Sequence, residues 1–158
     1  MSTGDVVVSD ASPLILLARI SRLDLLSKIA TRVVAPPAVW REATGNPGAP
    51  GASTVLAATW IEVRAPGAPI DGPLGLGERE AIALAKELDA VLIVDDGGAR
   101  SRAIAEGLKM VGTLGVLRRA KQLGHIERVA PIVDELRAHG LRVTDALIDR
   151  VLRDLGER

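Results

Sequence analysis

The sequence predicts a single α/β domain with a parallel sheet and helices on both faces. Short β-branched and aliphatic runs alternate along the chain with longer segments of helical periodicity. That alternation is typical of parallel strands joined by crossover helices. The length of 158 residues, 47% of them hydrophobic, suits one domain with a sizeable core. No internal repeat or linker divides the chain, so we expect the domain to span residues 1–158.

The N-terminal half is predicted to contribute three strands. In chain order, the expected elements are strand 6–8, helices 14–20 and 23–29, strand 32–35, a helix opening at Pro36-Pro37, a weak helix 54–58 and strand 60–63. Ser12 is a predicted helix cap, with Pro13 as the first helical residue, and Ser21 is a candidate cap for the second helix. The Gly- and Pro-rich segment 45–53 is a predicted loop.

The C-terminal half is predicted to add two strands and five helices. In chain order, the expected elements are helix 78–88, strand 91–94, helix 99–106, strand 109–111, helix 113–123 and two closing helices, 129–139 and 144–155. The first of these follows a Gly- and Pro-rich loop and has one broad apolar face. Gly107 and Gly124 are predicted helix ends, and Thr113 is a predicted cap.

Composition excludes several classes of protein. The chain has no Cys, so it has no disulfide, thiolate zinc site or Cys nucleophile. Trp40 and Trp60 are the only aromatic residues, which excludes a row of aromatics for stacking bases. The net charge is zero, and the basic residues concentrated in 97–128 are interpreted mainly as solvated helix faces. No signal peptide or membrane-spanning run is found, so we expect a cytoplasmic protein with no membrane partner.

Carboxylates follow two of the predicted strands directly. Asp10 comes after the first strand, and Asp95-Asp96 comes after the fourth. Ligands of open parallel sheets bind beyond the carboxyl ends of the strands, where these side chains would converge. Glu42 and Glu78 lie on helices next to strands two and four. Taken singly, Asp10 could cap a helix, Glu42 could be an exposed helix residue, and Glu78 could complement a helix dipole.

A cluster of carboxylates without His or Cys favours a hard divalent cation. Mg²⁺ and Mn²⁺ prefer oxygen ligands, and the mutual repulsion of close carboxylates needs a compensating charge. The adjacent pair Asp95-Asp96 is the hardest to explain as surface. The remaining polar candidates are interpreted as surface residues: Glu80, His125, His139, Asp145 and Asp149. The sequence has no Walker A loop, GxSxG elbow or HExxH motif.

Five segments together resemble one family. They are Asp10-Ala11-Ser12-Pro13-Leu14-Ile15, Pro36-Pro37-Ala38-Val39-Trp40-Arg41-Glu42, the segment 76–85, Asp95-Asp96 with Ala99-Arg100, and the segment 112–117. In this order and spacing, over nearly the whole chain, they resemble the PIN-domain superfamily. The resemblance is to a branch of small prokaryotic PIN-like proteins related to VapC-type toxins.

This resemblance implies a five-stranded parallel sheet in the order 3-2-1-4-5 and a catalytic, metal-binding site. The implied site consists of Asp10, Glu42, Glu78 and Asp96. Glu78 stands where VapC-type toxins usually have Asp, so its carboxylate reaches one methylene further. Asp95 is a predicted additional metal ligand, with the alternative that it holds Arg100 or Arg102.

The resemblance also implies a ribonuclease that hydrolyses RNA phosphodiester bonds with Mg²⁺ or Mn²⁺. Metal-activated water would attack, leaving a 5′-phosphate and a 3′-hydroxyl. Four residues are predicted to contact substrate: Ser12, Arg100, Arg102 and Thr113. The two arginines could instead form salt bridges with the acid pair. The expected partners are RNA, a cognate antitoxin of a toxin–antitoxin pair, and a second copy in a homodimer.

Two other functions compete with this one. The first is a catalytically silent PIN-like module that binds RNA or a protein. The second is a phosphoacceptor receiver domain, because an Asp pair after a strand also occurs there. The receiver layout places its acids after the first strand and a Lys after the fifth, whereas Lys109 precedes its strand here.

Overall fold

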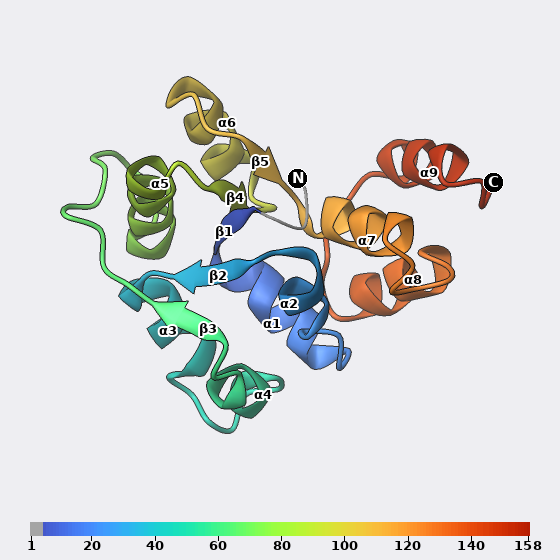
Figure 1. Cartoon of the computed structure of the whole chain (residues 1–158), viewed down its shortest axis with the longest axis horizontal. Coiled ribbons are helices and arrows are strands. Elements are labelled where there is room, and N and C mark those ends of the chain that lie inside the picture. Colours follow the sequence, from blue (N-terminus) through green and yellow to red (C-terminus); the bar gives the residue numbers. More distant parts are fainter. Residues whose placement is uncertain (1–4) are drawn as a thin grey trace.

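Five short strands form one fully parallel sheet at the centre of the molecule (Figure 1). The computed structural model describes residues 5–158. The strands are β1 (Val6–Ser9), β2 (Arg32–Ala35), β3 (Ile61–Val63), β4 (Val91–Ile93) and β5 (Met110–Val111). They lie in the order β3-β2-β1-β4-β5. The predicted fold class and strand order are therefore confirmed.

Helices connect the strands and extend beyond the last one. They are α1 (Ala11–Arg19), α2 (Leu25–Ile29), α3 (Pro37–Thr44), α4 (Ala52–Ala57), α5 (Leu76–Leu88), α6 (Gly97–Ala105), α7 (Thr113–Gln122), α8 (Ala130–Ala138) and α9 (Asp145–Asp154). Helices α5 and α6 lie on one side of the sheet and α1, α2 and α7 on the other (Figure 1). Both faces are therefore covered, as the sequence predicts.

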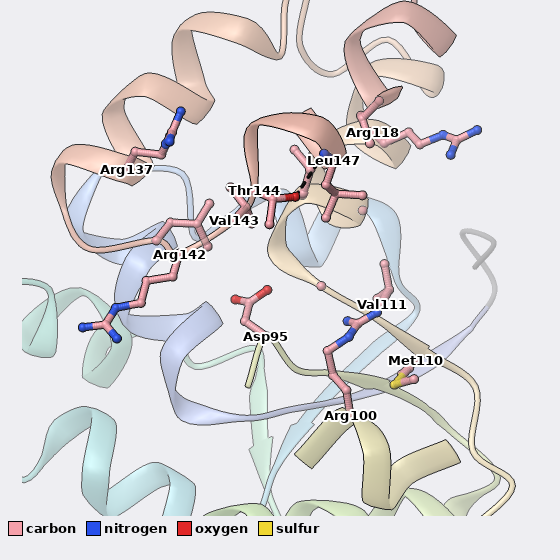
Figure 2. A pocket seen from close by; sticks show the side chains of 15 residues that line it. Asp95, Arg100, Met110, Val111, Arg118, Arg137, Arg142, Val143, Thr144 and Leu147 are labelled. Carbon is pink, nitrogen blue, oxygen red and sulfur yellow. Dashed lines mark hydrogen bonds between the residues drawn. The ribbon is translucent and has the colours of Figure 1, made fainter. Parts of the chain in front are cut away.

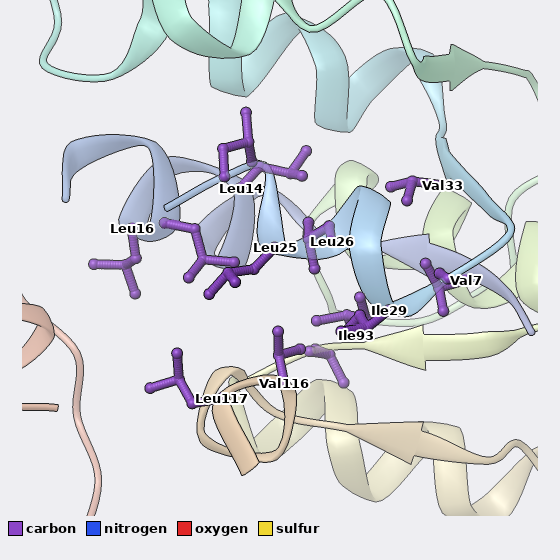
Figure 3. Packing of buried hydrophobic residues seen from close by; sticks show 14 of the residues in the cluster. Val7, Leu14, Leu16, Leu25, Leu26, Ile29, Val33, Ile93, Val116 and Leu117 are labelled. Carbon is purple, nitrogen blue, oxygen red and sulfur yellow. The ribbon is translucent and has the colours of Figure 1, made fainter. Parts of the chain in front are cut away.

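Strand β1 is the central strand and its register explains its burial. Val7 lies opposite Val33 of β2 and Val91 of β4. Strands covered on both faces are continuous apolar runs, and Val7 and Val8 are fully buried. Figure 3 shows Leu and Ile side chains of α1 and α2 packed between the sheet and α7. A core built almost without aromatic residues fixes β1 and β4, and therefore the position of the residues that follow them.

Several helix starts differ from the prediction. Helix α1 begins at Ala11 with Asp10 at the N-cap position, so Ser12 is an exposed residue of its first turn and not the cap. Thr113 is the first residue of α7, and Gly112 occupies the cap position. Ser21 has a positive φ of 59° and lies in the turn before α2, which has Asp24 at its N-cap position. The predicted glycine ends are confirmed, because Gly107 and Gly124 both have positive φ.

No helix within residues 5–158 is long and apolar enough to cross a membrane.

Candidate active site

Four carboxylates gather at the carboxyl edge of β1 and β4. Asp10 directly follows β1, and Asp96 lies at the N-cap of α6 beyond β4. Glu42 lies on α3 and Glu78 in the first turn of α5, and these two helices pack against each other. The charges of Glu78, Glu42 and Asp96 all act on Asp10. The structure thus brings together the four residues that the sequence predicts.

Asp10 is the buried member of the group, with 6% of its surface exposed. Its backbone amide donates to the carbonyl of Ile93 at 2.9 Å, which fixes it between β1 and β4. Its side chain makes no capping hydrogen bond to α1, so the helix-cap interpretation does not account for it. Burial, reinforced by the charges of Glu78, Glu42 and Asp96, raises the pKa of Asp10 to about 7.

Glu78 shares this electrostatic environment. Burial first, then the charge of Asp96 and a hydrogen bond with it, raise the pKa of Glu78 above its ordinary value. Its Oε2 atom is buried and has no hydrogen-bond partner among the described residues. A buried carboxylate oxygen without a partner is costly, and a cation is one group that would satisfy it.

Asp96 and Glu42 complete the group from its exposed side. Asp96 Oδ2 accepts the amide of Ala99 at 2.9 Å and so caps α6, which orients the carboxylate. Glu42 is exposed, and its Oε2 lies 3.4 Å from where a Cβ at Gly77 would begin. The first turn of α5 thus lies against the Glu42 side chain of α3, and the two helices that carry Glu42 and Glu78 pack together.

Asp95 has a different environment from its neighbour. Its Oδ1 accepts the backbone amide of Thr113 at 2.8 Å, and its Oδ2 accepts the Thr113 hydroxyl at 2.6 Å. Both oxygens therefore hold the start of α7 against the end of β4. Because neither oxygen is free, we leave Asp95 out of the proposed metal ligands. Thr113 is fully buried and contacts Asp95, so neither capping nor direct substrate contact describes its role.

The two predicted arginines do not pair with the acid pair. Arg100 donates through Nη1 to the carbonyl of Val94 at 3.0 Å. Arg102 donates to Glu106 at 3.1 Å and to the carbonyl of Asp71 at 2.8 Å. Among residues 5–158 neither arginine forms a salt bridge with Asp95 or Asp96. Arg102 is engaged elsewhere, whereas the guanidinium of Arg100 has no carboxylate partner in that part of the chain.

Sequence reasoning misses the role of Glu80. The sequence predicts a surface residue, but its Oε1 accepts the amide of Ala38 at 2.9 Å, in the first turn of α3. This bond ties α5 to α3 beside the candidate site. No local signal reveals it, because the two residues are 42 positions apart.

The donor set suits Mg²⁺ or Mn²⁺, because all four side chains supply only oxygen. The arrangement is nevertheless open. No three Asp, Glu, His or Cys side chains in the described part of the chain are close enough together to hold an ion as they stand. Binding would require movement of an exposed side chain such as Glu42. The unpartnered Oε2 of Glu78 and the mutual repulsion of the acids favour such an adjustment.

Comparison with known proteins identifies the family. A family model described as a PIN domain matches residues 6–157. A solved PilT N-terminus domain protein from the archaeon Sulfolobus solfataricus P2 is 23% identical, with a TM-score of 0.57 over 78% of this chain and 98% of that chain. A domain of a functionally unknown protein from Methanocaldococcus jannaschii DSM 2661 is 20% identical, with a TM-score of 0.48 over 69% and 91%. No match was found among curated proteins.

Proposed function

This chain belongs to the PIN-domain family, and on that premise we propose that it is a ribonuclease that requires Mg²⁺ or Mn²⁺. Proteins of the family are generally nucleases, typically dependent on a divalent metal. The observation that carries the proposal is the convergence of Asp10, Glu42, Glu78 and Asp96 at the carboxyl edge of the sheet. The substrate would be RNA, hydrolysed at its phosphodiester bonds.

Each carboxylate would make a distinct contribution to metal binding. Asp10 is rigid, since the backbone on either side is part of β1 and α1. Asp96 uses Oδ2 for the cap of α6 and would contribute Oδ1, the oxygen that takes no part in the cap. Glu78 offers the unpartnered Oε2, and Glu42 would close the site from solvent. If these residues hold a divalent cation, it would supply activation of water and compensation for negative charge in the transition state.

The charge state of Asp10 links binding to pH. Its pKa of about 7 means that the buried carboxyl keeps a proton through much of the acidic range. Cation binding must displace that proton, so we expect metal affinity to rise with pH up to about neutrality. The four acids would otherwise repel the phosphates of RNA. The cation is therefore needed for substrate binding as well as for chemistry.

The biological setting is proposed from the family resemblance. We place the protein in the cytoplasm as the toxin of a toxin–antitoxin pair, acting as a homodimer that an antitoxin neutralises. The receiver-domain alternative is wrong. Receiver sheets have the order 2-1-3-4-5, whereas this sheet has the order 3-2-1-4-5, and the family model is a different one.

One observation favours a second function. The carboxylates of the described residues are too open to hold an ion without rearrangement, which also suits a silent PIN-like module that binds RNA or a protein. The two functions differ in turnover.

The test is cleavage of a mixed RNA pool by the purified chain with Mn²⁺ or Mg²⁺, against EDTA. Asp10→Asn is the site variant, and Asp134→Asn, an exposed change on α8, is the matched control. Cleavage that needs metal, disappears in Asp10→Asn and persists in Asp134→Asn would support the nuclease. Well-folded protein without any metal-dependent cleavage would support the silent module.

A further inference from the structure

A cavity of about 840 Å³ lies beside the carboxylates, at the β5 end of the sheet. It is open to solvent and is lined by residues of β5, α6, α7, α8, the segment before α9, and α9 itself (Figure 2). Its volume falls in the range of small-ligand sites. Neither the family match nor the four-carboxylate site accounts for it.

The cavity is strongly cationic. Four arginines line it, from four different segments: Arg100, Arg118, Arg137 and Arg142. The one acid in its lining is Asp95, whose two oxygens are bound by Thr113. Two of the arginines have acidic neighbours. Arg137 lies 3.1 Å from Asp145, and Arg118 lies 4.0 Å from Asp154.

Arg100 and Arg142 are the arginines available to a ligand. Within residues 5–158, neither forms a salt bridge with a carboxylate. Arg142 is exposed, and Arg100 is held in place by its bond to the Val94 carbonyl. Figure 2 shows their guanidinium groups on opposite sides of Asp95, that of Arg142 pointing outward from the segment before α9 and that of Arg100 lying beside Val111. Because the Asp95 carboxylate lies between them, each arginine would contact a separate anionic group.

The rest of the lining is largely apolar. It includes Met110, Val111, Leu114, Val143, Leu147 and Val151. Leu147 is 40% exposed, so its side chain is accessible to a ligand in the cavity. Inorganic phosphate has no apolar surface and would leave such a wall without a contact. The cavity fits a ligand that is anionic at one end and flat and apolar at the other.

The cavity and the carboxylates share one wall. Asp95 lines the cavity, and Asp96, the next residue, belongs to the four-carboxylate group. Both follow β4, and the cavity continues past the end of β5 at the same edge of the sheet. A strand with one phosphate at the carboxylates that runs along this edge toward β5 would reach the cavity.

We propose that the cavity is a nucleotide subsite for single-stranded RNA. Arg100 and Arg142 hold phosphates of the strand on opposite sides of Asp95, and the aliphatic wall around Leu147 receives a base. This inference rests on the proposed ribonuclease function. With no aromatic residue in the lining, the base contacts aliphatic side chains and guanidinium planes, so recognition depends little on sequence.

An acidic, apolar peptide has related chemistry but fits the position less well. Its carboxylates would lie against Asp95 and Asp96 without an accompanying cation. An RNA strand brings a phosphate to a site that, once charged with a divalent cation, attracts it. The shared wall therefore favours the nucleic acid.

The test is equilibrium binding, separate from cleavage. A fluorescein-labelled, mixed-sequence single-stranded oligoribonucleotide is titrated with the full wild-type chain, in Ca²⁺ as an oxygen-binding cation that replaces Mg²⁺ to limit cleavage, and followed by anisotropy. Arg142→Ala and Leu147→Ser are added singly to this background. Arg150→Ala is the matched control, because Arg150 is exposed on α9 and lies outside the cavity. Thermal melts establish that each variant is folded.

We expect Arg142→Ala to weaken binding roughly ten-fold, as loss of one charge-assisted contact does. The dependence of log affinity on log salt should become shallower by about 0.7, because one phosphate contact to a single strand is lost. Leu147→Ser should weaken binding without changing that slope. An oligonucleotide with abasic sites should bind equally well with and without the Leu147→Ser change, because it has no base to place against the wall. Arg150→Ala should have no effect.

Several results would overturn the subsite. One is that the wild-type chain binds no RNA. Another is that the Arg142→Ala and Arg150→Ala variants bind RNA with equal affinity. A third is that a labelled peptide of alternating Glu and Leu displaces the RNA and binds the Arg142→Ala and Leu147→Ser variants more weakly. The last result would assign the cavity to a protein partner. If the cavity variants weaken binding as expected but the wild-type chain cleaves no RNA with any metal, the subsite stands and the nuclease falls.

Discussion

At the residue scale, Asp10 is the side chain that the fold treats most unusually. It is 6% exposed, makes no capping bond, and has a pKa raised to about 7, first by burial and then by three neighbouring acids. A buried carboxylate of this kind destabilises the metal-free protein whenever it ionises. Residues that oppose stability in this way are candidates for function, since packing alone does not explain them.

The first prediction concerns Asp10→Asn in EDTA. The folded-state pKa of about 7 lies above the ordinary value of 3.8, so the native state binds the proton more tightly than the unfolded chain does. The resulting stabilisation is complete below about pH 4 and is lost as pH rises through about 7. Asn cannot ionise, so the variant should exceed wild type in free energy of unfolding by a few kcal/mol near pH 8, with the gap closing toward pH 4.

Urea unfolding at a series of pH values measures this difference. Asp134→Asn, which changes an exposed aspartate, should follow the wild-type curve throughout. A constant difference between Asp10→Asn and wild type at every pH would contradict the raised pKa.

The second prediction concerns Thr113, whose hydroxyl donates to Asp95 at 2.6 Å. Thr113→Val keeps the shape but removes the donor, so one oxygen of the Asp95 carboxylate loses its partner. We expect a loss of about 1–3 kcal/mol in the free energy of unfolding. Thr113→Ser keeps the hydroxyl and should lose less. A Thr113→Val variant as stable as wild type, beside a destabilised Thr113→Ser, would show that the methyl group, and not the hydrogen bond, is what matters.

At the element scale, the contact between β5 and α7 depends on a glycine. A Cβ added at Gly115 would lie only 2.2 Å from Cγ2 of Val111, a distance that real structures do not tolerate. Both residues line the arginine-rich cavity, so their contact also shapes its floor. Valine is stiff at χ1 and cannot simply swing away.

The third prediction is that Gly115→Ala destabilises the protein by about 1–3 kcal/mol, as overpacking does. Val111→Ala alone should also destabilise it by leaving a small cavity. The double variant should then be more stable than the sum of the two losses predicts, because the clash and the cavity compensate each other. Chemical denaturation of wild type, the two single variants and the double variant measures this double-mutant cycle. If the two losses of unfolding free energy simply add in the double variant, the clash between residues 111 and 115 is not what destabilises Gly115→Ala.

A second element-scale feature joins the C-terminal segment to α7 and α8. Glu157 accepts the amides of Val129 and Ala130, at 2.7 and 2.9 Å, and pairs with Lys121 at 2.8 Å. Burial alone would raise the pKa of Glu157, but these three donors outweigh it and hold the pKa below its ordinary value. One carboxylate thus satisfies the start of α8 and a cation on α7.

The fourth prediction is that Glu157→Gln lowers the free energy of unfolding by about 1–3 kcal/mol at pH 7. Because the folded-state pKa is lowered, the stabilisation is present above the ordinary value of 4.5 and is lost as pH falls below it. Wild type and variant should therefore converge in acid. Glu127→Gln, an exposed change in the same region, is the control. A difference that persists unchanged at pH 3 would contradict the ionic contribution.

Sequence patterns predict elements better than they predict long-range polar contacts. The β-branched runs and the glycine ends are predicted correctly because local packing and backbone conformation decide them. The cap predictions for Ser12 and Thr113 are wrong because a hydroxyl near a helix start has the same local appearance in either role. The bonds Thr113–Asp95 and Ala38–Glu80 join residues 18 and 42 positions apart, which spacing alone cannot reveal.

Of the two sites, the carboxylate group could be predicted from the sequence and the arginine-lined cavity could not. The four carboxylates could be predicted because each follows a strand or lies on a flanking helix, and parallel strands end at one edge. The arginine-rich cavity could not, because its arginines come from four separate segments. From the sequence, Arg118 is interpreted as part of a solvated helix face and Arg100 as a residue that contacts substrate, and only the fold shows that both line a cavity with Arg142.

At the scale of the whole molecule, charge is separated although the net charge is zero. Acids gather beyond β1 and β4, and arginines gather beyond β5, at the same edge of one sheet. A divalent cation at the acids would offset part of their negative charge, so that this edge repels a polyanion less. Metal binding should therefore stabilise the folded chain directly, whether or not the chain cleaves RNA.

The fifth prediction follows from that linkage. A ligand that binds only the native state at about 100 times its Kd adds about 2.7 kcal/mol, which raises the Tm of a domain of this size by roughly 5–10 °C. Mn²⁺ should produce such a rise in wild type at pH 8 and a much smaller one at pH 5, where Asp10 holds its proton. Asp10→Asn should respond weakly at both pH values, and Asp134→Asn should respond as wild type does.

A folded wild-type chain whose Tm is unaffected by Mn²⁺ or Mg²⁺ at pH 8 would mean that the acids stay as open as they are in this structure. The RNA-binding or protein-binding module would then be the better description, because the cost of burying Asp10 would have no cation to offset it.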